Sequence, residues 1–254
     1  EQLETAGNLA ARPDLVEAQQ QVNTASAKVN QRVYQQAKEM DALGKRVALI
    51  GGDHSSPLGL IQYLCEKYHG DLGVLHIDAH HDLRDAYQGF QFSHASIMKN
   101  VLDLAAAPSA LVQVGIRDFS REEVELAREH PAVTTFYDDD MKEQLFLGKT
   151  FAALADEIVG SLPEKVYVSF DIDGLQPDLC PHTGTPVAGG LSLEQAQFLI
   201  KTLVKKGKTI VGFDLCEVAP NDARPEDQWD GNVGARVLFM LSSWMMESQG
   251  KLTD

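Results

Sequence analysis

The sequence has 254 residues and a formal net charge of −15, with 44% hydrophobic and 23% charged residues. This length suits one large domain, although length alone would also permit two smaller ones. The acidic balance argues against nucleic acid as a partner, because phosphate binding requires basic side chains; it favours cations, or is simply typical of a soluble surface. No apolar run approaches the roughly 18 residues of a membrane helix, so no membrane partner is expected. Three scattered cysteines favour a reducing, cytoplasmic compartment over a disulfide framework.

Short apolar runs alternate with longer helical patterns along the chain. Strands are predicted at Arg46–Ile50, Gly73–Ile77, Ala110–Gly115, Val133–Tyr137, Lys165–Phe170 and Thr209–Phe213. Helices are predicted near 13–43, 55–68, 94–105, 120–129, 141–160, 192–206 and 232–247. Ser120 with Glu123, and Ser192 with Gln195, have the spacing of helix starts. This alternation indicates a parallel sheet covered by helices on both sides, and we expect residues 1–254 to form a single domain.

Acidic and histidine residues follow several of these strands directly. VALI runs into GGDHS, GVLHI into DAHHD, and VYVSF into DID. Ligands of open parallel sheets bind beyond the carboxyl ends of the strands, so these residues are expected to meet there. In an extended segment Asp78, His80 and Asp82 would share one face, while Ala79 and His81 would point the other way.

Asp171 and Asp173 repeat this spacing on a second strand, and His54 follows Gly51 and Gly52, where the backbone can turn sharply. Four carboxylates and two imidazoles suit Mn²⁺ or a neighbour such as Co²⁺, Ni²⁺ or Fe²⁺, whereas a structural zinc site would favour thiolates. Because like charges destabilise one another, two divalent cations would offset the repulsion among the carboxylates. Any one of these residues could merely cap a turn, but their combination predicts a metal centre.

Three other histidines lie near these motifs in the sequence. His81 is expected on the opposite face from the ligands, in a supporting or packing position. His76 lies inside a predicted strand and is expected to be a hydrogen-bonded core residue. His182, in CPHTGTP, could reach the mouth of the site.

Four segments resemble signatures of the ureohydrolase superfamily, the arginase and agmatinase family: GGDHS at 51–55, DAHHD at 78–82, SFDID at 169–173 and GTPVAGGL at 184–191. The resemblance extends from about residue 46 to 245. It implies a three-layer α/β/α fold with a largely parallel central sheet. The family's first strand is not recognisable upstream, so we expect an N-terminal piece to be missing.

The resemblance also implies two divalent metal ions per chain, with Mn²⁺ expected and Ni²⁺ or Co²⁺ as alternatives. One ion would be bound by His54, Asp78, Asp82 and Asp171. The other would be bound by Asp78, His80, Asp171 and Asp173, so that Asp78 and Asp171 would bridge the two ions.

The family's chemistry is hydrolysis of a guanidino group to urea and an amine. A guanidinium carbon is a poor electrophile, and a hydroxide bridging two metal ions would be a sufficient nucleophile because coordination lowers the pKa of water from 15.7 to about 7. Asp82 would orient the proton of this hydroxide. By resemblance, His94 in FSHAS would protonate the departing amine, Glu217 in DLCEVAP would bind the guanidinium, and Thr185 would line the same pocket.

The substrate is less clearly indicated. Between Asp82 and His94 the chain lacks the Ser-Gly-Asn segment of arginases, and Ser120 stands where arginases have an Asp, so L-arginine is disfavoured. An agmatinase-like enzyme with a small cationic guanidino substrate is the leading interpretation. Guanidinobutyrate, guanidinopropionate, free guanidine and arginine stay open. Arg84 could bind a substrate carboxylate, or it could pair with Asp85 at the surface.

Two other classes remain as alternatives on the same fold. One is a metal-dependent amide deacetylase, which would use a single Zn²⁺ and fewer ligands. The other is a non-catalytic partner subunit that retains the site for stability. By resemblance we expect a homo-oligomer, a trimer or a hexamer.

Overall fold

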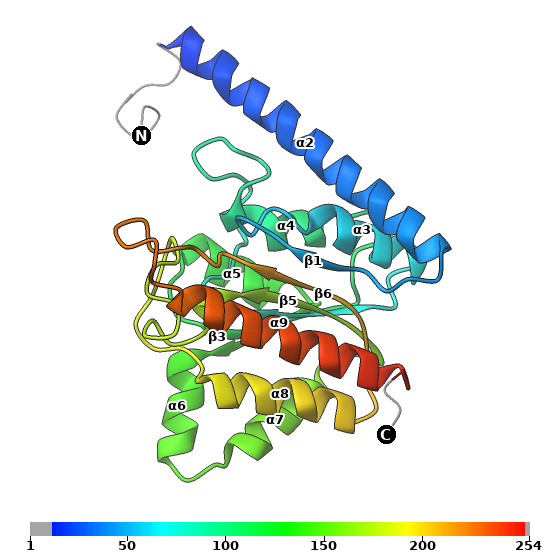
Figure 1. Ribbon diagram of the computed structural model, residues 1–254, viewed down its shortest axis with the longest axis vertical. Helices are drawn as coiled ribbons and strands as arrows, with labels where there is room; N and C mark the ends of the chain where they lie inside the picture. The colour runs from blue at the N-terminus through cyan, green and yellow to red at the C-terminus, as the bar shows by residue number, and fades with distance from the viewer. Residues whose placement is uncertain (1–11, 252–254) are drawn as a thin grey trace.

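A six-stranded parallel sheet forms the centre of the computed structural model, which describes residues 12–251 (Figure 1). The strand order is β1-β6-β5-β2-β3-β4, and every neighbouring pair is parallel. The strands are β1 (Ala48–Ile50), β2 (Gly73–Ile77), β3 (Ala110–Ile116), β4 (Val133–Tyr137), β5 (Lys165–Asp171) and β6 (Thr209–Cys216). All six predicted strands are confirmed, although β6 runs three residues further than the sequence indicated.

Helices connect the strands. They are α2 (Pro13–Ala42), α3 (Leu58–Lys67), the short η2 (His94–Ser96) followed by α4 (Ile97–Leu102), α5 (Arg121–Glu129), α6 (Asp138–Phe146), α7 (Phe151–Gly160), the short η3 (Ile172–Gly174), α8 (Leu193–Lys205) and α9 (Trp229–Ser248). The single helix predicted near 141–160 is wrong. Gly148 adopts a φ of 95°, which ends α6, and the Thr150 hydroxyl caps a new helix by accepting from Ala153 N.

Helices cover both faces of the sheet, as Figure 1 shows with α8 and α9 on one side and α3 and α4 on the other. One apolar core packs α7, α8 and α9 against the sheet, and a second packs α2, α3, α4 and α5 against its opposite face. The α/β/α prediction is therefore confirmed. Between residues 12 and 251, no helix is long and apolar enough to cross a bilayer.

Both predicted helix starts are confirmed as reciprocal caps. Ser120 accepts from Glu123 N while the Glu123 carboxylate accepts from Ser120 N, and Ser192 and Gln195 make the same exchange. Because all strands are parallel, their carboxyl ends lie at one edge of the sheet. The segments that follow β1, β2, β5 and β6 therefore converge there.

Candidate metal centre

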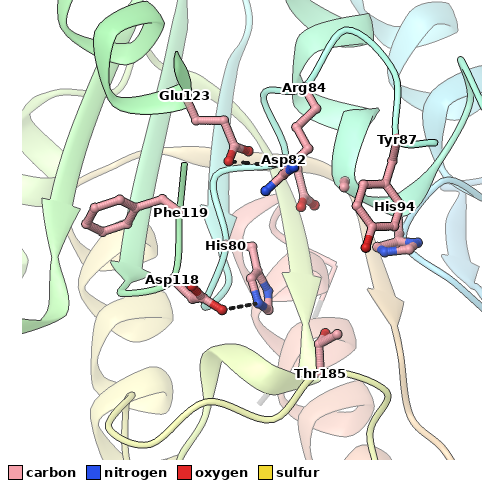
Figure 2. Close-up of a pocket in the computed structure, with 10 residues that line it drawn as sticks. His80, Asp82, Arg84, Tyr87, His94, Asp118, Phe119, Glu123 and Thr185 are labelled. Carbon is pink, nitrogen blue, oxygen red and sulfur yellow. Dashed lines mark ion pairs between the residues drawn. The ribbon is translucent and has the colours of Figure 1, made fainter. Parts of the chain in front are cut away.

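A cavity of about 170 Å³ opens at the carboxyl edge of the sheet (Figure 2). Segments that follow β2 and β3 form much of its wall. The lining residues are His80, Asp82, Arg84, Tyr87, His94, Ala95, Asp118, Phe119, Glu123 and Thr185. The cavity therefore brings together two of the predicted ligands with His94 and Thr185, which lie far from each other in the sequence.

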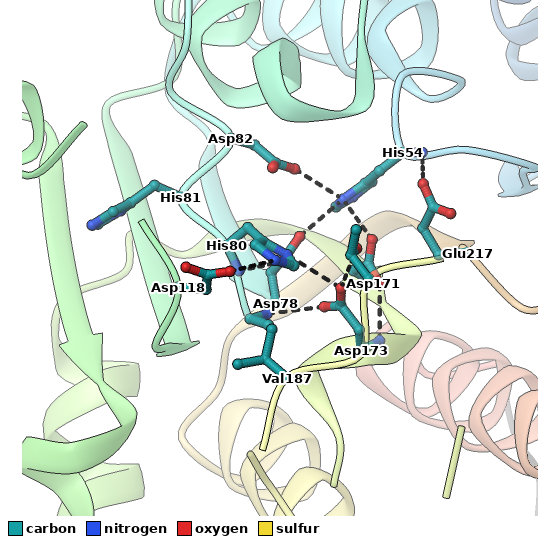
Figure 3. Close-up of polar contacts among 12 residues, drawn as sticks. His54, Asp78, His80, His81, Asp82, Asp118, Asp171, Asp173, Val187 and Glu217 are labelled. Carbon is teal, nitrogen blue, oxygen red and sulfur yellow. Dashed lines mark hydrogen bonds and ion pairs between the residues drawn. The ribbon is translucent and has the colours of Figure 1, made fainter. Parts of the chain in front are cut away.

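The six predicted ligands lie together beside this cavity (Figure 3). Asp78, Asp82, Asp171 and Asp173 are at most 4% exposed, and His54 is 1% exposed. Only the His80 side chain, 23% exposed, has appreciable contact with solvent. A cluster of carboxylates withdrawn this far from water needs compensating positive charge.

The His54 ring faces three of the carboxylates. Its Nδ1 lies 3.0 Å from Asp78 Oδ2, 3.3 Å from Asp82 Oδ2 and 3.3 Å from Asp171 Oδ2. On its other side, Nε2 lies 2.8 Å from Ser169 Oγ. These contacts bring together the four residues that the family resemblance assigned to one ion.

His80 forms a second group with Asp78 and Asp173. Its Nδ1 lies 3.3 Å from Asp78 Oδ1 and 3.2 Å from Asp173 Oδ2. Asp171 is linked to this group through its Oδ1, which accepts from Asp173 N at 2.9 Å. Asp78 therefore presents one oxygen to each histidine, which is the arrangement that a bridging carboxylate requires.

The donor atoms fit divalent cations. His80, Asp78 and Asp173 offer ligand atoms within 4.8 Å of one another, and so do His54, Asp78 and Asp82 together with His76. Burial, followed by the charges of Asp173 and Asp78, raises the pKa of Asp171 well above its usual value. Although burial alone would lower it, the Asp173 and Asp78 carboxylates raise the pKa of His80 to about 11. Protons and metal ions would thus compete for the same atoms.

The chain after β2 departs from the extended geometry assumed from the sequence. β2 ends at Ile77, the backbone bends at Asp78 and Ala79, and Asp82 has a φ of 55°. Asp78, His80 and Asp82 converge because of this irregular turn and not through simple strand alternation. His81 does point away from the cluster: its ring contacts Gln113 Oε1 at 2.7 Å and the Tyr137 hydroxyl at 3.2 Å.

The catalytic candidates occupy different places around the cluster. His94 lines the cavity with its ring edge-on to Tyr87. The Thr185 hydroxyl donates to Asp173 Oδ2 at 3.2 Å. Glu217 follows β6 with a φ of 64°, and its Oε1 accepts from His54 N at 2.9 Å. Glu217 is not among the described residues that line the cavity, so the structure places it beside His54 and not in the cavity wall.

Arg84 reaches the cavity but does not pair with Asp85. Its Nε lies 3.5 Å from Glu123 Oε2 and its guanidinium stacks over the Tyr87 ring at 5.5 Å, while Asp85 pairs with Lys99. Glu123 also accepts from Leu83 N. The surface pairing considered for Arg84 is therefore wrong.

Two further histidines have clear partners. His182 is held by Asp230 of α9, through ring and backbone contacts of 2.8 and 2.9 Å. His76, expected to be only a core residue, lies with Nε2 at 2.8 Å from Asp78 Oδ2. The spacing of two between His76, in β2, and Asp78, directly after it, was a signal that could have found this contact, because side chains two apart point to the same side of an extended chain.

Comparison with known proteins points to one family. A family model described as the arginase family matches residues 2–241. The chain is 39% identical over 178 residues to an N(1)-aminopropylagmatine ureohydrolase of Thermus thermophilus, covering 70% of this chain and 56% of that protein. It is 35% identical to an agmatinase of Bacillus anthracis, over 82% of this chain and 67% of the other. The chain thus spans just over half to two thirds of the length of these relatives.

Solved structures of similar proteins have a similar fold. Proclavaminate amidino hydrolase from Streptomyces clavuligerus superposes with a TM-score of 0.74 at 28% identity, covering 89% of this chain and 71% of the other. Agmatine ureohydrolase of Thermoplasma volcanium superposes with a TM-score of 0.69 at 27% identity, over 89% and 70% of the two chains.

Proposed function

The chain belongs to the arginase family, and from this premise we propose that it hydrolyses a C–N bond of a small cationic guanidino compound, releasing urea and an amine. The observation that carries the proposal is the cavity in which His94, Thr185, His80 and Asp82 meet beside a cluster of buried carboxylates. A purely structural metal site would not need an adjoining cavity or a histidine in its wall.

We propose two overlapping ligand sets for two divalent ions. His54, Asp78, Asp82 and Asp171 would hold one ion, and Asp78, His80, Asp171 and Asp173 the other. Bound ions would lower the pKa of a water molecule at the cavity and thus provide a nucleophile at neutral pH. We propose Mn²⁺, with Ni²⁺ or Co²⁺ as alternatives, because oxygen-rich sites with imidazole suit these ions.

The remaining steps belong to side chains around the cavity. Asp82 would accept a hydrogen bond from the attacking water and orient it. His94 would hand a proton to the departing amine, since imidazole suits proton transfer near neutral pH. Glu217 would pair with the guanidinium; His54 N–H donates to its carboxylate, and burial raises the pKa of that carboxyl. Thr185 would line the binding space while donating to Asp173.

We propose an amine-bearing substrate of the agmatine type in preference to a guanidino acid. Arg84, which could have bound a substrate carboxylate, is already held by Glu123 and Tyr87. Asp118, whose side chain is 67% exposed in the cavity wall and lies 3.8 Å from His80 Nε2, would offer its carboxylate to a distal ammonium group. An exposed carboxylate at this position favours a substrate with positive charge at both ends.

The test is urea release from agmatine, aminopropylagmatine, guanidinobutyrate, guanidinopropionate, arginine and guanidine, with Mn²⁺ and Ni²⁺ supplied separately. Release from an amine-bearing substrate is expected, with loss on chelation and in Asp171→Ala and His80→Ala variants. A preference for guanidinobutyrate would instead assign Arg84 to a substrate carboxylate. If no compound yields urea from the metal-loaded protein, the hydrolase proposal fails.

Assembly and metal count can be measured in the same preparation. We propose a homo-oligomer, a trimer or hexamer, in a reducing cytoplasmic compartment; the buried free thiols of Cys65, Cys180 and Cys216 are compatible with the latter. Light scattering would give the mass of the assembly. Elemental analysis should give two metal ions per chain, whereas one Zn²⁺ per chain would favour the amide deacetylase alternative.

A further inference from the structure

A row of polar side chains, buried on all but the outermost strand, crosses the sheet beside the candidate metal centre. Thr135, Gln113, His76, Ser169 and Asp214 are register partners on β4, β3, β2, β5 and β6 in turn. Register partners on neighbouring strands point to the same face of a sheet. Sheet interiors of this kind are ordinarily apolar, so a polar row in this place needs an explanation.

The orientation of the Gln113 side chain is determined by its neighbours. Its Nε2 lies 2.8 Å from the backbone carbonyl of His81, which can only accept, so this atom must be the NH₂ group. The same Nε2 lies 3.0 Å from His76 Nδ1. Its Oε1 accepts from His81 Nδ1 at 2.7 Å. Gln113 therefore donates to His76 and accepts from His81.

This orientation determines the protonation of His76. A ring nitrogen that faces an amide NH₂ at 3.0 Å must present its lone pair, because two donors would repel each other. His76 Nδ1 is therefore unprotonated and the ring proton is on Nε2. His76 and Gln113 are both 0% exposed, so water offers no alternative partner to either.

The proton on His76 Nε2 points at Asp78. The distance from Nε2 to Asp78 Oδ2 is 2.8 Å, and Asp78 Oδ1 accepts from His80 N at 2.6 Å. Each carboxylate oxygen thus has one donor apart from the rings of the proposed ligands, and each also faces one of those rings: His54 Nδ1 lies 3.0 Å from Oδ2 and His80 Nδ1 lies 3.3 Å from Oδ1.

We propose that Gln113 is a positioning residue of the metal centre: by fixing His76 as the Nε2–H tautomer, it holds Asp78 in the orientation that bridges two cations. This inference rests on the proposed role of Asp78 as a metal ligand. Partners that orient a ligand commonly change metal affinity by roughly 10- to 100-fold when removed. Gln113 acts through two intervening side chains and touches neither metal nor substrate.

The tautomer can be measured in the unaltered protein. Long-range ¹H–¹⁵N correlation spectra of the histidine-labelled, metal-free chain distinguish Nδ1–H, Nε2–H and doubly protonated rings, and a His76→Gln variant would assign the signal. We expect the Nε2–H pattern for His76. An Nδ1–H or doubly protonated ring would overturn the proposal, whatever the enzyme's activity.

Metal affinity provides the second test, by calorimetric titration of Mn²⁺ into the metal-free chain. Gln113→Met keeps the volume but removes the donor, and we expect Mn²⁺ affinity to fall about tenfold or more. His76→Gln supplies an amide donor toward Asp78 that needs no partner at position 113. In that background Gln113→Met should change affinity by about twofold at most, the level of independent sites.

Tyr137→Phe is the matched control. It removes a hydroxyl from the far side of the same network, where Tyr137 contacts His81, and leaves the Gln113–His76 contact intact. Its Mn²⁺ affinity should equal that of the unaltered chain. The proposal of positioning through His76 would be refuted if Gln113→Met lowered Mn²⁺ affinity equally in the parent chain and in the His76→Gln background. It would also be refuted if Gln113→Met lowered the affinity in neither. If the unaltered chain binds no Mn²⁺, the proposed metal centre fails, while the spectra still decide the tautomer.

Discussion

At the scale of single residues, the backbone before His54 passes close to a side chain of the neighbouring strand β6. Gly51 and Gly52 precede His54, and neither has a positive φ. A Cβ on Gly51 would lie 2.6 Å from Cys216 Sγ, whereas a Cβ on Gly52 would have no heavy atom within 4 Å. The segment needs one glycine because β1 and β6 pack side by side, and not because the turn demands a left-handed conformation.

Gly51→Ala should therefore lower the free energy of unfolding by about 1–3 kcal/mol, the usual cost of overpacking. Gly52→Ala is the control and should stay within about 0.5 kcal/mol of the parent protein. Urea denaturation of both variants measures the difference. Equal stabilities for the two would show that Cys216 yields to the extra methyl group.

At the scale of elements, helix ends tie the outer layers to the site. Glu123 in the first turn of α5 caps the helix through Ser120, and it also binds Leu83 N and Arg84 at the cavity. At the other end of the molecule, Asp41 of α2 accepts from Lys67 and Tyr63 of α3 at 2.6 Å each. The first contact connects a helix to the proposed chemistry, while the second contributes to stability alone.

Ser120→Ala and Glu123→Gln should separate the capping of α5 from the positioning of Arg84 at the cavity. Ser120→Ala removes only the cap and should cost about 1 kcal/mol of unfolding free energy with KM unchanged. Glu123→Gln should keep the cap, because a glutamine at this position accepts from the N-cap N–H as Gln195 does, but it should raise KM several-fold, because Arg84 loses the carboxylate that holds it at the cavity wall. Steady-state kinetics give KM, and urea denaturation gives the free energy of unfolding, for both variants. An unchanged KM in Glu123→Gln would contradict the role of Glu123 in holding Arg84 at the cavity.

Asp41→Asn should lower the unfolding free energy by about 1 kcal/mol at pH 7. Although burial opposes the change, the bonds from Lys67 and Tyr63 lower the pKa of Asp41 below its usual 3.8. A lowered native pKa contributes stability above the unfolded value, and this is lost as pH falls through the native value. The difference from the parent should thus shrink below pH 3.8. Glu39→Gln, exposed on the same helix, should change little.

At the scale of the whole molecule, the two apolar cores hold a charged cluster at the carboxyl edge of the sheet. The four carboxylates of the proposed site are nearly buried, and their repulsion acts against the folded state when cations are absent. Metal binding should therefore be coupled to global stability.

Chelation should lower the melting temperature, and Mn²⁺ should restore it. A ligand that binds only the native state adds about 2.7 kcal/mol at 100 times its Kd. Calorimetry with chelator, with Mn²⁺ and with Mg²⁺ as a control ion measures this effect, and Asp171→Ala should abolish the response. An equal melting temperature in all three conditions would contradict a metal centre at this position.

The strands, two helix starts and the meeting of the proposed metal ligands could be predicted from the sequence. Short apolar runs located all six strands, and paired caps at Ser120 and Ser192 located two helix starts, because these signals are local. The spacing of His54, Asp78 and Asp171 after strands predicted that they would meet, since parallel strands end at one edge. The break between α6 and α7 was missed because a left-handed Gly148 is indistinguishable in sequence from a glycine inside a helix.

Only the tertiary structure decided what depends on contacts across strands. The pairing of Arg84 with Glu123, the place of Glu217 beside His54, and the contact of Gln113 with His76 join residues that lie far apart in the sequence. The residue types and their order along the chain determined the chemistry at the sheet edge. Strand register and the direction of each hydrogen bond determined which groups support it, because these are properties of neighbouring strands and not of any one of them.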